Sequence, residues 1–366
     1  MTSAAPLFQP FTLGSLQLEN RIVMAPMTRS FSPGGVPGED VVAYYRRRAE
    51  NAVGLIITEG TTIDRPGASF DPAVPNFHAP ESLAGWKRVV DAVHAAGGKI
   101  APQRWHVGMA RRPGTGPRPE APSDSPSGVL PNGKQIGEPM SDADIADTID
   151  AFAKAAKAAV ETGFDAIELH GAHGYLIDQF FWEGLNKRAD RFGGDAIGRT
   201  TFAREIIKAV RANMPADMPL ILRYSQWKQQ DYSARLANTP QELEAILAPL
   251  SDAGVDLFHA STRRFWIPEF EGSDLNLAGW TKKLTGKPVI TVGSVGLNSD
   301  FLGAFMGEGS PAASIDGLIK RLEDGEFDLV AVGRALLSDY QWAAKVRDGR
   351  FGELKDFSAE ALKELV

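Results

Sequence analysis

The sequence predicts a closed parallel (β/α)8 barrel, a TIM barrel, and three observations favour this α/β fold. Short apolar runs rich in β-branched residues recur along the chain, each followed by a longer segment with helical spacing. Eight such units are present, and strands that alternate with helices pair in parallel because each return to the sheet needs a crossover. No linker or break in composition divides the chain, so we expect a single domain over residues 1–366. An open, doubly wound sheet is the alternative.

The predicted strands alternate with segments of very different length. The strands are Arg21–Pro26, Gly54–Gly60, Lys99–His106, Asp165–His170, Leu220–Ser225, Val255–Ser261, Pro288–Gly293 and Phe327–Arg334. Two short apolar stretches around Gly14 and Ser15 precede them and indicate an N-terminal hairpin capping the barrel bottom. The segments Arg111–Pro139 and Trp182–Asp195 are long, and loops of that length usually cover a site or are partly mobile.

Helix starts can be identified between the strands. Ser141 followed by Asp144 resembles a capping box, and apolar residues follow at helical spacing. Thr239 and Pro240 mark a second start, with Glu242 positioned to bond back to the helix N-terminus.

Composition excludes several classes of protein. The chain has 46 acidic and 39 basic side chains, a net charge of −7, which argues against a nucleic-acid partner. We interpret Arg46–Arg48 as a solvated helix face. No apolar run approaches the ~20 residues that cross a bilayer, and the first residues lack signal-peptide features. Because the sequence contains no cysteine, disulfides, thiolate nucleophiles and iron–sulfur clusters held by cysteine are excluded. We expect a cytoplasmic protein, a monomer or a small homo-oligomer.

Small and basic residues end the last two predicted strands. Barrels of this type build their active sites at the carboxyl ends of the strands. Gly293-Ser294 and Gly333-Arg334 would let backbone N–H groups approach a phosphate there. Arg334 would add a charge-assisted hydrogen bond. Turn glycines without any ligand are the alternative for this pair.

Two histidines lie three residues apart at the end of the fourth predicted strand. His170 and His173 could ligate zinc, with His106 or His259 as the third ligand. They could instead both donate N–H groups to one substrate oxygen. A histidine satisfied within the fold is the structural alternative. Because no inward-facing third ligand is evident, we favour the donor pair and expect no metal.

Three further polar residues suit a redox cofactor and its substrate. The Tyr175 phenol stays protonated at neutral pH and can deliver a proton to a carbanion-like centre, although it could equally pack at a loop–helix junction. Arg223 lies on a strand and needs an anion, either a reduced cofactor or a structural partner such as Glu59 or Glu168. The amide of Gln103 matches the donor and acceptor pattern of a flavin pyrimidine edge. Taken alone, this residue is a weak signal.

At these residues the sequence resembles the old yellow enzyme family of FMN-dependent NAD(P)H:flavin oxidoreductases and ene-reductases. The resemblance runs from Pro6 to about Tyr340. It is carried by the segments Leu7–Phe11, Asn20–Arg29, Gln103–Gly108, His170–Leu176 and Asn186–Gly194. Relatives with iron–sulfur clusters are excluded as whole-enzyme matches because their clusters need cysteines.

The resemblance implies non-covalent FMN, NADPH or NADH as reductant, and a small enone, quinone or nitro compound as substrate. It implies contacts to the flavin ring from Pro26, Met27, Gly60, Gln103 and Arg223. It implies a hydroxyl near the carbonyl that adjoins N5, supplied by Thr28. It implies a phosphate site made of Gly293, Ser294, Gly333 and Arg334.

The same resemblance assigns the substrate side. His170 and His173 would polarise the carbonyl or nitro oxygen, and Tyr175 would protonate the carbon α to it. Trp105 matches an aromatic residue of the substrate pocket. Independently of the resemblance, Phe265 and Trp266 follow the sixth predicted strand and could overhang the pocket, or could be local packing.

This chain departs from the family pattern at several positions. His173 stands where many members have Asn, and both types can donate an N–H. Thr28 stands where another branch has Cys. Arg104 replaces an apolar residue, and Ser294 replaces a frequent Gly or Asn. The insert Gln226–Gln230 is not explained by the common pattern.

The sequence therefore predicts a ping-pong flavin enzyme. NAD(P)H would reduce FMN, and hydride would then reach the β-carbon of an activated alkene while Tyr175 protonates the α-carbon. A metal-dependent lyase or hydrolase that uses the two histidines is one alternative. A flavoprotein that stores or senses FMN without catalysis is the other.

Overall fold

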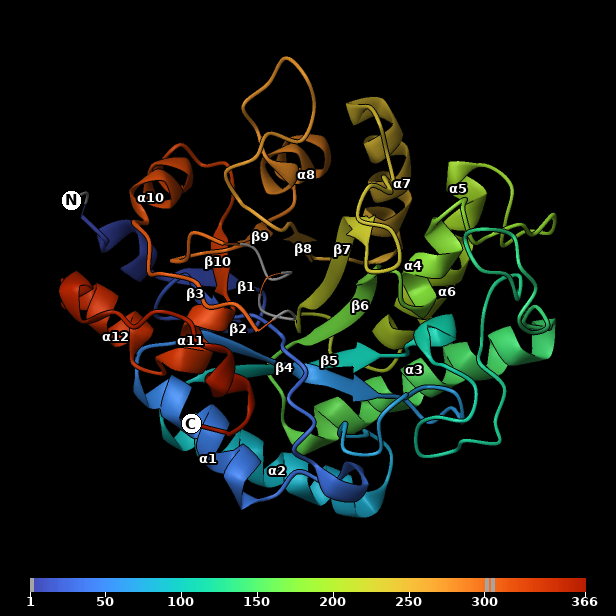
Figure 1. Cartoon of the computed structure of the whole chain (residues 1–366), viewed down its shortest axis with the longest axis horizontal. Helices are drawn as coiled ribbons and strands as arrows, with labels where there is room; N and C mark the ends of the chain where they lie inside the picture. The colour runs from blue at the N-terminus through green and yellow to red at the C-terminus, as the bar shows by residue number, and fades with distance from the viewer. Residues whose placement is uncertain (1–2, 300–302, 304–306) are drawn as a thin grey trace.

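Eight parallel strands enclose the centre of the computed structural model, which describes residues 3–299, 303 and 307–366 (Figure 1). The strands are β3 (Ile22–Met24), β4 (Leu55–Thr62), β5 (Lys99–Trp105), β6 (Ile167–His173), β7 (Leu220–Lys228), β8 (Leu257–Ser261), β9 (Val289–Val292) and β10 (Leu329–Val332). They are hydrogen-bonded in chain order, and β10 pairs with β3 through Val330 and Ile22. The sheet therefore has no open edge. The predicted TIM barrel is confirmed, and the open-sheet alternative is wrong.

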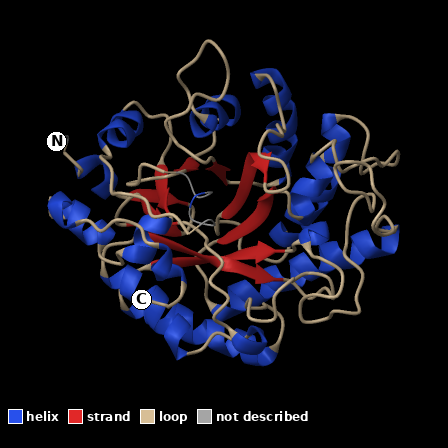
Figure 2. Cartoon of the chain, in the orientation of Figure 1, coloured by secondary structure: helices blue, strands red, loops and turns tan. Residues whose placement is uncertain are grey.

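Helices surround the strands on the outside of the barrel (Figure 2). The α-helices are α1 (Glu39–Glu50), α2 (Pro80–Ala95), α3 (Asp142–Thr162), α4 (Leu176–Phe181), α5 (Ala196–Arg199), α6 (Thr201–Arg211), α7 (Pro240–Ala253), α8 (Leu277–Thr285), α10 (Asp316–Glu323), α11 (Arg334–Ser338) and α12 (Trp342–Arg347). The 3₁₀ turns are η1 (Ala5–Phe8), η2 (Pro33–Gly35), η3 (Gly108–Ala110), η4 (Phe351–Glu353) and η5 (Ala359–Leu362). Among the described helices, none combines the length and the apolar character needed to span a bilayer.

Both predicted helix starts are confirmed. Ser141 caps α3 through reciprocal hydrogen bonds with Asp144. Thr239 caps α7 by accepting from the backbone N–H of Glu242. The Glu242 carboxylate does bond back, but to the N–H of Asn238, one residue before the cap, at 2.7 Å.

Some strands end at other residues than predicted, because backbone pairing continues past the apolar run that marks the strand in the sequence. β7 continues past Ser225 because it pairs with β6 again, His173 opposite Lys228, after a register shift. The insert Gln226–Gln230 is therefore partly strand, and it stands beside the end of β6. A sequence pattern cannot detect this extension because it depends on pairing across the sheet.

The predicted N-terminal hairpin is present and plugs the amino end of the barrel. β1 (Phe11–Leu13) and β2 (Leu16–Leu18) pair antiparallel through the turn at Gly14. Leu16 and Leu18 pack in one cluster with the apolar side chains inside the barrel, among them Val23, Ile57, Ile221 and Ile290. The barrel is thus closed at this end and open only at the carboxyl ends of the strands.

Arg104 is buried in the outer apolar layer with no hydrogen-bond partner among the described residues for Nε, Nη1 or Nη2. Its guanidinium lies 3.3 Å from the centroid of the Phe77 ring. Burial lowers the pKa of Arg104 well below the usual arginine value. A charge without a counterion in such a layer is destabilising.

Replacement of Arg104 by methionine is expected to raise the free energy of unfolding by about 1–3 kcal/mol, because a similar volume is kept and the desolvation penalty is removed. Urea unfolding of the two proteins at pH 7 measures the difference. The exposed Arg112, replaced in the same way, is the control and should change the free energy little. A less stable Arg104→Met protein would contradict this account.

Candidate functional site

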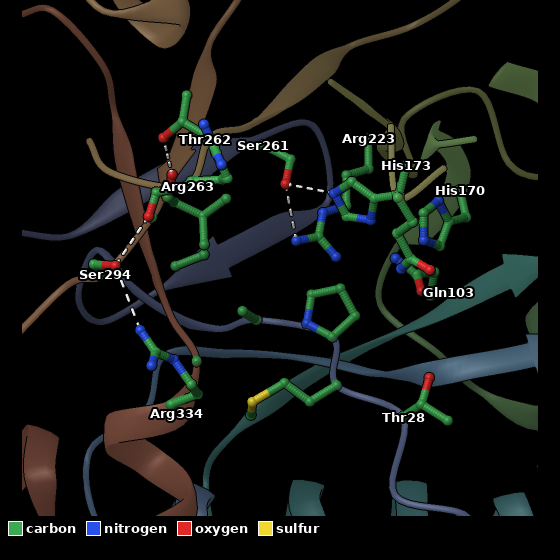
Figure 3. A pocket seen from close by; sticks show the side chains of 18 of the residues that line it. Thr28, Gln103, His170, His173, Arg223, Ser261, Thr262, Arg263, Ser294 and Arg334 are labelled. Carbon is green, nitrogen blue, oxygen red and sulfur yellow. Dashed lines mark hydrogen bonds between the residues drawn. The ribbon is translucent and has the colours of Figure 1, made fainter. Parts of the chain in front are cut away.

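A cavity of about 500 Å3 lies at the carboxyl ends of the strands. It is lined by side chains from the barrel strands and the segments that follow them. Figure 3 shows Ser294 and Arg334 at one end and Gln103, His170 and His173 at the other. The structure brings together these predicted site residues: Pro26, Met27, Thr28, Gln103, Trp105, His170, His173, Tyr175, Arg223, Gly293, Ser294, Gly333 and Arg334.

Three predicted site residues do not line this cavity. A Cβ at Gly60 would lie 2.5 Å from the Trp105 ring, so Gly60 sits behind that ring and makes room for it. Phe265 is buried against Trp266, with ring centroids 5.1 Å apart, and its N–H donates to the carbonyl of Gly293. Trp266 is 38% exposed. Phe265 and Trp266 therefore do not line the cavity, and Phe265 packs behind the loop after β9, which agrees with the local-packing alternative.

The two long loops do not line the cavity either. The Arg188 guanidinium donates to carbonyls of Pro126 and Met140, which ties the two segments to each other. Among the described residues, the cavity is lined instead by Phe70, Phe357 and Leu362, together with Trp227 and Gln229. The expectation that these long loops cover the site is not met.

The end of the cavity near β9 and β10 is built around small residues and one arginine. Gly293 has φ +141°, and a Cβ there would lie 2.6 Å from the Thr262 hydroxyl, so only glycine fits. Ser294 also has a positive φ of 51°, a conformation that glycine and asparagine adopt more readily. A Cβ at Gly333 would meet no protein atom closer than 3.6 Å, so its absence leaves open space. Arg334 donates to Ser294 and Ser299.

At the opposite end, Arg223 carries a buried charge beside the cavity. Its Nη2 donates to the Ser261 hydroxyl at 3.2 Å, and its Nε has no partner among the described residues. Burial lowers the pKa of Arg223 to about 10, against the opposing charge of Glu168. Neither Glu168 nor Glu59 is within salt-bridge distance of Arg223 in the described chain. This donor is thus available to an acceptor in the cavity.

Gln103 is oriented by a buried network beneath the cavity. Its Nε2 donates to Glu168 at 2.7 Å, and the second Glu168 oxygen lies 2.7 Å from Nδ1 of His259. Because a carboxylate only accepts hydrogen bonds, Gln103 must turn its NH2 group toward Glu168. Its amide oxygen remains for a ligand N–H.

His170 presents a defined hydrogen-bond donor to the cavity. Burial, assisted by the charge of Arg223, holds the pKa of His170 well below its usual value, so the ring is neutral. Its Nδ1 accepts the backbone N–H of Ala172 at 3.3 Å. In a neutral imidazole the hydrogen then resides on Nε2.

His173 is held by residues from β7 and β8. Its Nε2 lies 2.8 Å from the Ser261 hydroxyl, which already accepts from Arg223. Donation of the Ser261 hydrogen to His173 Nε2 would leave the ring hydrogen on Nδ1. The Trp227 ring stacks on His173 with centroids 4.4 Å apart. Burial lowers the pKa of His173 strongly, so this ring is neutral too.

Tyr175 is fixed between two rings of the cavity wall. Its ring meets those of Trp105 and His170 edge-on, each at 4.9 Å between centroids. Its hydroxyl accepts from Nε2 of Gln229 at 3.1 Å. Burial raises the pKa of Tyr175 to about 12, so it carries its proton at neutral pH. The side chain is thus a protonated donor at the cavity rather than a hydroxyl in bulk water.

The loop that carries Thr28 rests on a buried carboxyl group. Glu59 accepts the backbone N–H groups of Arg29 and Ser30 at 2.9 and 3.2 Å. Burial raises the pKa of Glu59 to about 7, and the two backbone hydrogen bonds oppose that rise.

Glu59→Gln is expected to remove part of the pH dependence of stability. The pKa of Glu59 is about 7 in the folded protein and 4.5 as a reference, so the folded state binds the extra proton between these values. The contribution of Glu59 to the free energy of unfolding is therefore complete below pH 4.5. It decreases by roughly 3 kcal/mol as pH rises to 7. Glutamine keeps the acceptor oxygen without the charge.

Urea unfolding at pH 5 and pH 8 checks this prediction. The variant should gain stability over the native protein at pH 8 and little at pH 5. The exposed Glu120, replaced by Gln, is the control. An equal change at both pH values would contradict the assignment.

The zinc alternative needs a third ligand beside His170 and His173. His106 instead faces Asp124, with Nε2 2.8 Å from the carboxylate. His259 faces Glu168, as described above. Within residues 3–299, 303 and 307–366, no group of three or more ligating side chains is placed to hold a metal ion. This geometry favours the two histidines as hydrogen-bond donors.

The prediction from the sequence missed several residues of the site. Ser261 could have been found, because it ends the sixth predicted strand, where His259 alone was considered. Trp227 and Gln229 were signalled only by the unexplained insert Gln226–Gln230. The remaining lining residues that were not predicted include Phe70, Thr262, Arg263, Phe357 and Leu362.

This chain is similar to known flavin and NADH oxidoreductases. A model of the NADH:flavin oxidoreductase / NADH oxidase family matches residues 6–353. The chain is 40% identical over 225 residues to 12-oxophytodienoate reductase 7 of Oryza sativa subsp. japonica, covering 58% of this chain and 57% of that protein. It is 34% identical over 366 residues to an NADH oxidase of Thermoanaerobacter brockii, covering 97% of this chain and 52% of that protein. The chain thus spans a little over half the length of these curated relatives.

A solved structure points the same way. Morphinone reductase in complex with tetrahydroNAD matches with a TM-score of 0.81 and 27% identity, covering 97% of this chain and 93% of that chain. The family match covers all the barrel strands and every residue that lines the cavity up to Leu337. The resemblance found in the sequence is therefore confirmed: this chain belongs to the NADH:flavin oxidoreductase / NADH oxidase family, the old yellow enzyme family.

Proposed function

We propose that this protein is an FMN-dependent ene-reductase whose residues 1–366 form one FMN-binding domain. When bound, FMN supplies a two-electron carrier that passes hydride from NADPH or NADH to the β-carbon of an α,β-unsaturated carbonyl or nitro compound. A quinone would be an alternative electron acceptor. The cavity and its donors support this proposal, as does membership of a flavin oxidoreductase family.

The residues at the two ends of the cavity fit FMN. Open space over Gly333 and the charge of Arg334 suit a phosphate, with Gly293 and Ser294 beside them. At the other end, Nε of Arg223, which has no partner in the part of the chain that the structure describes, would meet the ring, and the charge of Arg223 would balance the negative charge of the reduced state. The Gln103 oxygen would accept from the imide N–H, with Pro26, Met27 and Thr28 along the ring.

The substrate would lie against the histidines and Tyr175. His170 and His173 would each donate an N–H to the carbonyl or nitro oxygen, which withdraws electron density from the double bond. Tyr175 would give its proton to the α-carbon. Trp105 would form an aromatic wall. The observation that carries the proposal is the neutral His170, with its hydrogen on Nε2, beside the protonated Tyr175 in a cavity that also holds Arg223.

An absorbance spectrum followed by two anaerobic mixing steps tests the function. We expect a yellow protein that is bleached by NADPH or NADH and regains its colour with cyclohexenone. Bound FMN without oxidation of NAD(P)H by any enone or quinone would instead indicate a storage or sensing protein. A colourless preparation that contains zinc would indicate a metal-dependent enzyme.

A further inference from the structure

The end of β7 at Lys228 and the following residue Gln229 are attached to the turn that carries Tyr175. Lys228 Nζ lies 2.6 Å from Asp178 Oδ1, and both side chains are buried. The second Asp178 oxygen accepts the N–H of Gly174 at 2.7 Å. The backbone N–H of Gln229 donates to the carbonyl of His173 at 3.2 Å. These contacts hold Gln229 at a set position relative to the Tyr175 ring.

The side chain of Gln229 contacts the Tyr175 hydroxyl. The distance from Gln229 Nε2 to the phenol oxygen is 3.1 Å, and both residues line the cavity. A primary amide nitrogen donates and does not accept, so the phenol oxygen is the acceptor in this bond. The hydroxyl hydrogen of Tyr175 is therefore directed elsewhere. In the described chain, no other hydrogen bond to the Tyr175 hydroxyl is found.

The neighbours of Tyr175 do not fix this hydrogen by themselves. Trp105 and His170 contact the ring edge-on and set its plane, but a phenol O–H can still rotate about its C–O bond. The charge of Arg223 favours the ionised form of Tyr175, but no hydrogen bond between these two side chains is found in the described chain. Gln229 is thus the side chain placed to orient the proton.

We propose that Gln229 is the positioning residue for the proton donor: its amide N–H holds the Tyr175 oxygen so that the hydroxyl hydrogen faces the cavity. This rests on the proposed function. In the step, the O–H bond of Tyr175 breaks and a C–H bond forms at the α-carbon, which uses the electron pair of the polarised double bond. The bonding pair of the O–H group stays on the phenolate oxygen, where the Gln229 N–H stabilises it until solvent returns a proton.

The pKa of residue 175 tests the contact without any turnover. With the more acidic 3,5-difluorotyrosine at position 175, fluorine NMR follows ionisation of the phenol at lower pH than tyrosine itself would allow. Gln229→Leu is expected to raise this pKa by about 1 to 2, because the phenolate loses a charge-assisted hydrogen bond. Gln230→Leu is the matched control. Gln230 is the next residue after Gln229 and also follows β7, but its amide donates to the carbonyl of Gly174 at 3.2 Å.

An unchanged pKa in Gln229→Leu, or an equal rise in Gln230→Leu, would overturn the proposal. This pKa measurement tests the contact between Gln229 and Tyr175 without relying on the proposed function. If the native protein fails to reduce enones, the proposed function and the catalytic use of this proton are both contradicted. A rise in the pKa of residue 175 in Gln229→Leu would then still support the contact between Gln229 and Tyr175.

Half-reactions then test the role in catalysis. Gln229→Leu is expected to slow anaerobic reoxidation by cyclohexenone about tenfold and to leave reduction by NADPH within about twofold, because only reoxidation uses the proton. In Gln229→Glu an ionised carboxylate accepts the Tyr175 hydrogen, whereas the protonated acid can donate. Reoxidation of that variant should recover as pH falls, relative to the native protein. Equal losses in both half-reactions, or a pH profile parallel to that of the native protein, would reject the positioning role.

Discussion

His170→Ala is expected to lower the rate of alkene reduction by about 10²–10³-fold, the usual cost of losing one donor to a developing oxyanion. The imidazole is neutral because burial depresses its pKa, and Ala172 occupies Nδ1, so the Nε2 hydrogen faces the cavity. A protonated ring is not required. We therefore expect the His170 contribution to be constant across neutral pH. Cyclohexenone turnover at saturating NADPH measures the loss.

The half-exposed His78 offers a matched control, since it lies outside the cavity beside Asp64. His78→Ala should retain the native rate. If His170→Ala turned over cyclohexenone as fast as the native protein, the histidine pair would not be the donor for the substrate oxygen. The FMN content of each variant, read from its spectrum, separates loss of chemistry from loss of cofactor.

Tyr175→Phe is expected to slow reoxidation by an enone by about 10²–10⁴-fold, the range for removal of a positioned general acid. Reduction by NAD(P)H should stay close to native, because that half-reaction needs no proton from the phenol. Burial keeps Tyr175 protonated, with a pKa of about 12, so the native rate should not fall from ionisation of this group at moderately alkaline pH. Anaerobic stopped-flow absorbance resolves the two half-reactions.

Tyr340→Phe provides the comparison, because Tyr340 is half-buried and does not line the cavity. It should leave both half-reactions unchanged. A Tyr175→Phe protein impaired equally in both half-reactions would show that the ring packs the site and that its proton is not used. Nitro compounds with an acidic α-carbon should be less sensitive than enones, since solvent can protonate the product.

The barrel could be predicted because its signals are local. Each strand is a short apolar run, and each helix start, such as Ser141 with Asp144, is defined by residues within one turn. Closure followed from the number of units and the parallel pairing. The end of β7 could not be predicted in this way. Its last residues are mostly polar, and they are strand because Lys228 pairs with His173 from a distant part of the chain.

The site residues can be separated in the same way, into those that the sequence could place and those that depend on tertiary contacts. Residues at strand ends, such as His170, Arg223 and Gly333, could be placed at one mouth because parallel strands bring their carboxyl ends together. The sequence could not show whether a residue near a strand end faces the cavity. Phe265 and Trp266 follow a strand end too, yet Phe265 turns behind the loop after β9.

Residue types and their order along the chain thus sufficed for the barrel, for the family and for most polar groups of the cavity. Tertiary contacts decided how those groups act. Glu168 turns the Gln103 amide, Ser261 links Arg223 to His173, and Gln229 orients Tyr175. Each of these pairs joins different strands or loops. Hydrogen-bond direction and proton position depend on distances of a few ångströms, which are set only when the strands assemble.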